Sequence, residues 1–183
     1  MPETTNPNYN ISPDEKVAPV MAYMLNSIVW GDVIVKNAIR VGTWLRTHMA
    51  PDMLCLYNAK LLVTNSGGTT IHPLSLPEIH IPTAQIQAFL IVPPTKDPLD
   101  YDTNEPNRRM DPVTVISGAA RIDGFMRFAT MSNMKKYLEV NKENFSPIYD
   151  AEITNLAIPS LRAIHVQHVI VRQSTSMFMV RPI

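Results

Sequence analysis

Four arginines are the residues whose type and spacing best suit a chemical role. Arg40 and Arg46 lie in one stretch of the chain, and Arg121 and Arg127 lie in a similar stretch, six residues apart in both cases. Positions six apart on one strand project from the same face of a sheet. Because a guanidinium binds carboxylates and phosphates through paired hydrogen bonds, the arrangement predicts two equivalent anion sites. The alternative is salt bridges, to Glu152, to Asp123 or to a neighbouring chain.

Histidine and cysteine give weaker signals. Histidine is a common metal ligand, but His165 and His168 are three apart and point to opposite faces of a strand. His72 and His80 are not spaced as a ligand pair, so we expect all four to be surface or interface histidines, with no metal or cofactor. Cys55 is the single cysteine and lies in an apolar run, which predicts a buried structural thiol. With no nucleophile elbow and no phosphate loop in the sequence, we expect no enzyme activity.

Charge and hydropathy exclude further classes of function. Lys plus Arg and Asp plus Glu number 16 each, so no net charge attracts nucleic acid, which we do not expect as a partner. No stretch reaches the roughly 18 apolar residues that a membrane helix needs. The N-terminal residues lack the pattern of a secretory signal. We therefore expect a cytoplasmic protein without membrane insertion.

The elements that must position these side chains begin with a predicted helix. Ser12, Pro13 and Glu15 fit an N-cap, a first-turn proline and a capping glutamate, and apolar residues follow at helical spacing. From Gly31 onward, short segments rich in Val, Ile and Thr alternate with turns and with many of the 16 prolines, which predicts strands. The expected organisation is a flexible arm (1–11), an amphipathic helix (12–30), a first β repeat (31–94), a linker rich in Pro and Asp (95–112) and a second β repeat (113–183).

Within the second repeat, residues 113–128 read as strand and Ser132 as the cap of a short helix. Later strands are expected at 145–154, 165–172 and 177–180.

Three blocks recur in the same order on both sides of the linker, which indicates an internal duplication. Each copy has about 60 to 70 residues, a size at which a lone core is marginal, so the copies should pack on each other or on other chains. The matched blocks are 38–46 with 119–127, 56–61 with 148–153, and 81–91 with 158–171.

The second and third blocks resemble the Sm-like small β-barrel. The run Ile148 to Glu152 resembles the first signature of that family, an apolar pair followed by an Asp-Ala step, and 166–171 lies where the last strands of the second signature would be. The repeat is also similar, over 33–92 and 113–180, to a bacterial family of Sm-like domains of unknown function. The resemblance implies two tandem barrels.

The RNA-binding residues of that family are not matched. Its Asn before the first signature is replaced by Met53 and Phe145, and 165–168 contains no Arg-Gly pair. A uridine pocket is therefore not expected. What the resemblance still implies is ring or edge-to-edge assembly through strand pairing.

These observations predict a mainly β protein with minor α content, built as two tandem Sm-like barrels after an amphipathic helix. The expected function is that of a non-catalytic scaffold or assembly protein, which forms a homo-oligomer as a ring or a filament. Binding of a different protein as a further partner is compatible with this function. The alternative is a nucleic-acid or small-anion binding module that uses the four arginines. Methionine is abundant and suits either core filling or adaptable interfaces; the candidate interface residues are Met21, Met24, Met177, Phe178 and Met179.

Overall fold

The computed structural model describes residues 10–64 and 72–182, which form one open antiparallel sheet of ten strands in the order β10-β6-β7-β8-β9-β5-β1-β2-β3-β4. The mainly β prediction is confirmed. The strands are β1 (Glu15–Tyr23), β2 (Ser27–Lys36), β3 (Met53–Val63), β4 (Leu74–Pro82), β5 (Ala88–Ile91), β6 (Arg108–Ser117), β7 (Ala120–Ala129), β8 (Phe145–Asn155), β9 (Ile164–Arg172) and β10 (Ser176–Val180).

Helical structure in the described residues is short. The predicted helix near Ser132 is present as α1 (Met134–Val140), although its cap is Asn133, whose Oδ1 accepts a hydrogen bond from the Lys136 amide at 2.9 Å. The remaining helical elements are 3-10 turns, namely η1 (Val41–Arg46), η2 (Thr83–Gln85) and η3 (Gln173–Thr175). None of the helices in the described part of the chain is long and apolar enough to cross a membrane.

The predicted amphipathic helix over 12–30 is wrong, because this segment forms β1, a tight turn and the start of β2. Ala18, Val20 and Ala22 are buried at alternate positions, which is the period of a strand. The Pro19 carbonyl points toward the β5 side and accepts a hydrogen bond from the Val92 amide at 2.9 Å. The N–H that proline lacks would point to the same side, just beyond the residues of β1 that pair with β5, so no pairing bond is lost and Pro19 is tolerated. The apolar residues fit both periods, and tertiary pairing selects the strand.

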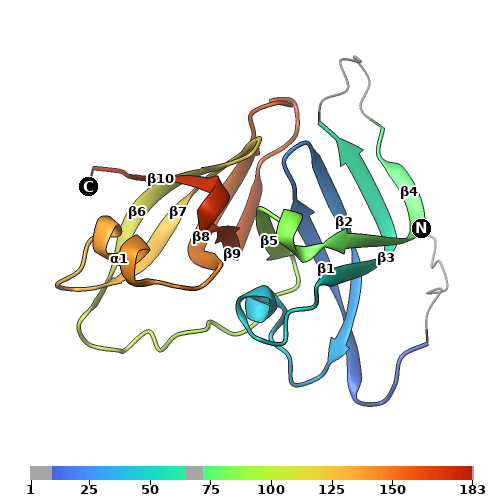
Figure 1. The fold of residues 1–183 in the computed structure, drawn as a ribbon, viewed down its shortest axis with the longest axis horizontal. Helices are drawn as coiled ribbons and strands as arrows, with labels where there is room; N and C mark the ends of the chain where they lie inside the picture. The colour runs from blue at the N-terminus through green and yellow to red at the C-terminus, as the bar shows by residue number, and fades with distance from the viewer. Residues whose placement is uncertain (1–9, 65–71, 183) are drawn as a thin grey trace.

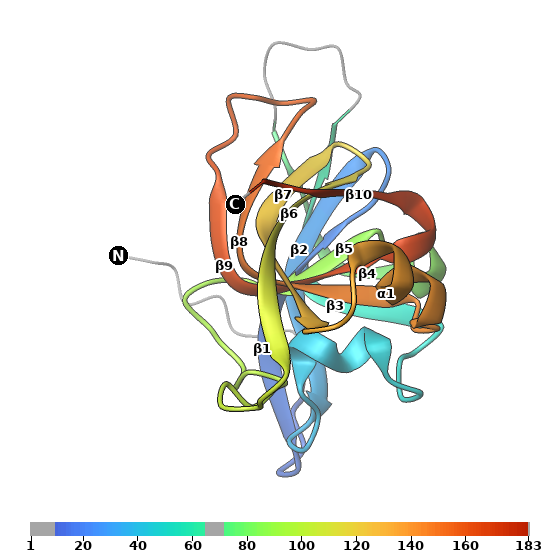
Figure 2. The same cartoon turned by 90° about the vertical axis from the view of Figure 1, so that its left-hand side faces the viewer.

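The sheet consists of two groups of five strands with the same internal order. Strands β1 to β5 lie in the order β5-β1-β2-β3-β4, and strands β6 to β10 lie in the order β10-β6-β7-β8-β9. The groups occupy opposite sides of the molecule and meet where β5 lies beside β9 (Figures 1 and 2). There Ala88 pairs with Val171 and Leu90 with Val169. This leaves β4 and β10 as the two outer strands.

Both groups carry the same irregularity between their second and third strands. The β2–β3 register shifts beside Gly31, and the β7–β8 register shifts beside Gly124. Opposite these shifts, Asn58 and Asp150 adopt positive φ values of 48° and 45°. Asn and Asp tolerate this left-handed conformation better than most residues, which explains why they occur at the bulges that bend the strands.

Only one of the three matched sequence blocks falls on corresponding strands. The 56–61 and 148–153 block lies on β3 and β8, the third strand of each group. The other two matches are wrong as structural equivalences. Residues 38–46 surround η1 whereas 119–127 lie mostly on β7, and 86–91 includes β5 whereas 166–171 lies on β9, its partner in the sheet.

Two apolar cores lie on the sheet, and each receives side chains from both groups. One core is built mainly from β6 to β9 and includes Ala88 and Leu90 of β5. The other is built mainly from β1 to β4 and includes Phe145 and Ile170 of the second group. Burial of these side chains across the junction fixes the two groups on each other.

Candidate functional site

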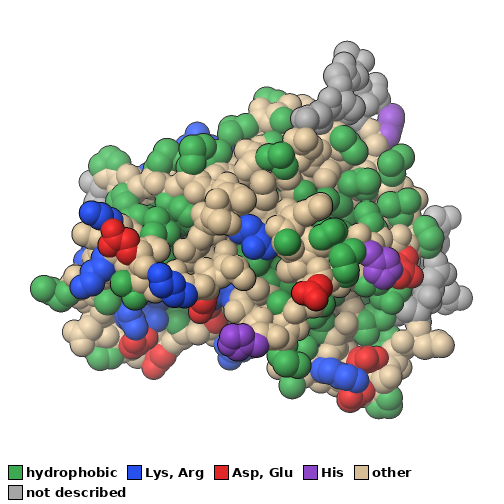
Figure 3. Space-filling view, in the orientation of Figure 1, with side chains coloured by type: hydrophobic (Ala, Val, Ile, Leu, Met, Phe, Trp, Pro, Cys, Tyr) green, Lys and Arg blue, Asp and Glu red, His purple; other side chains and the backbone are tan. Residues whose placement is uncertain are grey.

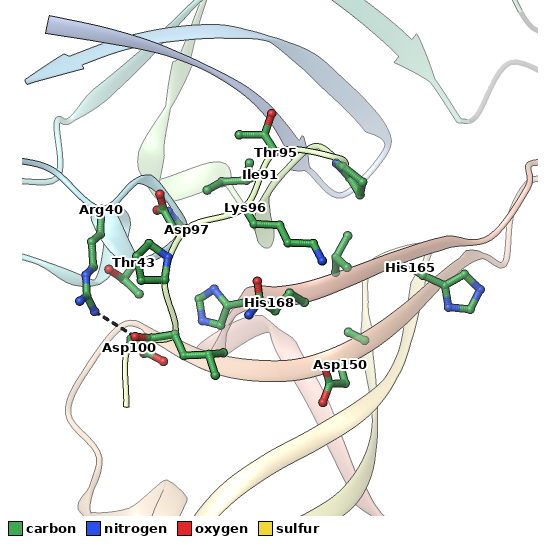
Figure 4. A pocket seen from close by; sticks show the side chains of 17 residues that line it. Arg40, Thr43, Ile91, Thr95, Lys96, Asp97, Asp100, Asp150, His165 and His168 are labelled. Carbon is green, nitrogen blue, oxygen red and sulfur yellow. Dashed lines mark hydrogen bonds between the residues drawn. The ribbon is translucent and has the colours of Figure 1, made fainter. Parts of the chain in front are cut away.

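A cavity of about 500 Å³ lies at the junction of the two strand groups. Its walls come from the η1 turn, from the segment 93–100 that leaves β5, and from β8 and β9 (Figure 4). Apolar side chains such as Ile91, Leu99 and Val166 alternate in the wall with charged and polar ones. A concave site with few, convergent polar groups is typical of small-molecule binding sites.

The segment 93–100 is held over the cavity by its aspartates. Asp97 Oδ2 accepts a hydrogen bond from the Gly42 amide at 2.9 Å, which satisfies a backbone donor at the start of η1. A Cβ on Gly42 would lie 3.3 Å from His168 Nδ1, so glycine leaves the room that brings the turn close to β9. The Pro-rich and Asp-rich stretch expected as a linker is therefore a wall of the site, and β6 already begins at Arg108.

Asp100 forms the polar floor of the junction. Its Oδ2 accepts from Arg46 Nη1 at 2.7 Å, and its Oδ1 accepts from the Tyr149 hydroxyl at 2.8 Å. Burial, together with the Asp100 charge and hydrogen bond, raises the pKa of Tyr149. Burial alone would lower the pKa of Arg46, but its bond to Glu143 at 2.7 Å and the Asp100 charge raise it overall. The hydrogen bonds hold these side chains in one arrangement, which suits a positioning role.

His168 is the most perturbed group in the cavity wall. Burial lowers its pKa from 6.5 to about 4, so the imidazole is neutral at physiological pH. Its Nε2 is buried without a hydrogen-bond partner among the described residues. The ring lies beside that of Tyr149, with 5.3 Å between centroids. A neutral imidazole with an unpaired nitrogen can donate to or accept from a bound polar group.

Two cations reach the cavity without a carboxylate partner. Arg40 donates from Nη1 to the Leu99 carbonyl at 3.2 Å, and Lys96 extends into the space between the walls (Figure 4). No ion pair of either residue occurs within residues 10–64 and 72–182. Among the carboxylates of the wall, Asp97 and Asp100 are already bound to Gly42 and Arg46, and Asp150 lines the cavity from β8.

The predicted arginine pairs separate in the structure. Arg121 and Arg127 lie on one face of β7 as expected. Arg40 precedes η1 and Arg46 is its last residue, so these two do not share a strand. Three of the four form salt bridges, but only Arg121 uses one of the predicted partners. Arg46 pairs with Asp100 and Glu143, Arg121 with Asp123 at 2.8 Å, and Arg127 with Glu105 at 2.7 Å. Only Arg40 faces the cavity.

A second hollow of about 450 Å³ gathers Arg46, Arg108, Arg127 and Lys136 beside α1. Arg108 and Arg127 both contact Glu105, and Arg46 contacts Glu143, so most of this positive charge is balanced. The surface view agrees, because basic and acidic side chains are interspersed over this part of the molecule (Figure 3).

The candidate interface residues lie at two places. Met21 and Met24 are half-buried and pack against the two cores, so they fill space inside the chain. On the outer strand β10, Met177 is 64% exposed and Met179 is 43% exposed, while Phe178 between them packs against a core.

Sequence reasoning missed the roles of Lys96, Asp97, Asp100 and Tyr149. The hydrogen bonds of Asp97, Asp100 and Tyr149 join residues about 50 positions apart, and no local pattern marks such pairs. Comparison with protein-family models, with curated proteins and with solved structures finds no match.

Proposed function

We propose that the protein is a non-catalytic assembly module, a tandem of two Sm-like units whose chains join through strand edges into a ring or a filament. The observation that carries this is the pairing of β9 with β5 inside the chain. The outer strands β4 and β10 hold the same places in their groups as β9 and β5 hold in theirs. A β10 edge can therefore add to the β4 edge of another chain in the way β5 adds to β9.

The registers give the expected contact between chains. Leu54 lies four residues before Asn58, and Ser146 lies four residues before Asp150. Their strand partners, Ile81 on β4 and Val171 on β9, are therefore equivalent positions. By the same reasoning Met177 on β10 corresponds to Ala88 on β5. The intermolecular pairs are then Met177 with Ile81, Phe178 with His80, and Met179 with Ile79.

The side chains at these edges support self-association. Met177 and Met179 lie on one face of β10, and Val180, which is 55% exposed, adds an apolar side chain on the other face. Exposed apolar edge strands are templates for pairing with another chain. Pro77 on β4 would block pairing at its own position, but it lies outside Ile79–Ile81. The contact is head-to-tail, which generates a ring where the rotation closes and a filament where it does not.

Light scattering over a concentration series tests the proposal. The native chain is expected as a multimer, and the variant Met177→Lys/Met179→Lys as a monomer with unchanged thermal stability, because both side chains are exposed. Met131→Lys/Leu156→Lys is the matched control, since it replaces two exposed apolar residues, 93% and 51% exposed, away from both edges. A native chain that stays monomeric at all concentrations would contradict the proposal.

A second candidate function is the binding of a small organic anion in the junction cavity. It is favoured by Arg40 and Lys96, which line the cavity beside apolar wall residues and form no ion pair in the part of the chain that the structure describes. The fluorescent sulfonate 1-anilinonaphthalene-8-sulfonate is a suitable probe. Its affinity should fall in Arg40→Gln/Lys96→Gln and stay unchanged in Lys60→Gln, an exposed lysine on β3. Equal binding by all variants would exclude the site.

A mobility assay with RNA at low salt tests the nucleic-acid alternative, which the balanced surface charge disfavours.

A further inference from the structure

Three potential metal ligands meet on the solvent side of β3 and β4. Cys55 on β3 pairs directly with His80 on β4, and Glu78 lies two residues from His80 on the same face. One ligand atom from each of the three lies within 4.8 Å of the others. The expectation that Cys55 is a buried core thiol is wrong, because the side chain is half-buried and lies on the opposite face from buried Leu54 and Leu56.

The ligand atoms are already directed toward each other. Cys55 Sγ donates to Glu78 Oε1 at 3.3 Å, and His80 Nε2 lies 2.6 Å from the same oxygen. Leu54, Leu56 and Ile81 are buried on the opposite face and anchor both strands to the core. Sites on paired strands hold their geometry better than sites on loops.

We propose that Cys55, Glu78 and His80 bind a zinc ion in a three-ligand site with a fourth position open to water or to an external ligand. Sulfur, imidazole nitrogen and carboxylate oxygen are the three donor types that zinc uses in proteins, and the thiolate disfavours Mg²⁺ and Ca²⁺. A thiolate and a carboxylate together balance the charge of a divalent ion. On binding, the Cys55 thiol proton passes to solvent and a zinc–sulfur bond forms.

One chain supplies all three ligands, so the site needs no second chain, although His80 lies within the β4 stretch proposed for self-association. Its position differs from that of the junction cavity, which has its walls on β8, β9, η1 and segment 93–100. The open fourth position on an exposed face makes a site of moderate affinity that can exchange its outer ligand.

Titration of the reduced chain with Co²⁺, followed by displacement with Zn²⁺, tests the site. We expect one equivalent of Co²⁺ to give a sulfur-to-metal charge-transfer band and the intense visible bands of tetrahedral cobalt, both removed by Zn²⁺. Cys55→Ser should abolish the charge-transfer band. Glu78→Gln and His80→Asn should each weaken Co²⁺ binding by a factor of about 10 or more.

His165→Asn is the matched control, because His165 is an exposed strand histidine outside the cluster, and it should bind Co²⁺ like the native chain. Thermal melts without metal show whether each variant folds. The proposal is overturned if no charge-transfer band forms, or if His80→Asn and Glu78→Gln bind as tightly as the native chain. A failed assembly test leaves this result unaffected, since the readout is spectroscopic and needs no oligomer.

Discussion

The guanidinium of Arg172 lies over the ring of Phe145, with 4.4 Å between its central carbon and the ring centroid. The same side chain donates from Nε to the Ile86 carbonyl at 2.8 Å and from Nη2 to the Thr83 carbonyl at 2.6 Å. One residue at the end of β9 therefore binds a core ring of the second strand group and the turn before β5 of the first. The corresponding position at the end of β4 is Pro82, so the proposed contact between chains lacks this clamp and should be weaker than the internal junction.

Arg172→Met is expected to destabilise the chain by about 2 to 3 kcal/mol, because two carbonyls lose a charged donor while the apolar length of the side chain is kept. Chemical denaturation measures the effect. Arg162→Met, at an exposed position, is the control and should leave the transition midpoint unchanged. Equal midpoints for both variants would show that the clamp contributes nothing.

His168 should make stability depend on pH in the acidic range. Its pKa is about 4 in the folded chain, against 6.5 for an unperturbed histidine, so between these pH values the unfolded chain binds a proton that the folded chain does not. The free energy of unfolding therefore has its full value above pH 6.5. It decreases as the pH falls toward 4, by up to roughly 3 kcal/mol.

The test compares unfolding of the native chain with that of His168→Gln over this pH range. Asp97, Asp100 and Arg46 surround the ring and remain in both proteins, so the difference in slope reports His168 alone. His165→Asn, the exposed control, should keep the native slope. The prediction is wrong if His168→Gln keeps it too.

Gly31 and Gly124 should each resist substitution by alanine. A Cβ on Gly31 would lie 2.6 Å from the Tyr57 carbonyl oxygen, and one on Gly124 would lie 2.8 Å from that of Tyr149. Because these neighbours are backbone atoms of the bulged strand, the strands must separate, at a cost of about 1 to 3 kcal/mol. Gly42→Ala, which meets a side-chain nitrogen at 3.3 Å, should cost less in the same thermal melts.

Tyr149→Phe should lower stability by about 1 to 3 kcal/mol, because it leaves Asp100 Oδ1 without its donor in a largely buried network. Tyr101→Phe is the control. Tyr101 packs edge-on against Tyr149, with 4.9 Å between ring centroids, and this contact needs only the ring. Denaturation curves that shift equally for both variants would contradict the role given to the hydroxyl.

The sequence by itself determined the β character of the chain and several element positions. Strands expected at 145–154, 165–172 and 177–180 match β8, β9 and β10 to within one residue. Local composition decides such elements, since β-branched residues at period two between prolines and turns fit few other conformations. For β1 both periods were present, and the pairing of Val20 and Tyr23 with β5 settled the choice.

Only the tertiary structure decided where the functional candidates lie. Cys55 faces His80 because the β3–β4 register pairs them, and a slip of one residue would turn either side chain to the core. The cavity exists because Asp97 and Asp100 of an irregular segment bind Gly42 and Arg46, far away in the chain. Register and long-range contacts arise from the packing of the whole chain, so no local pattern of residues specifies them.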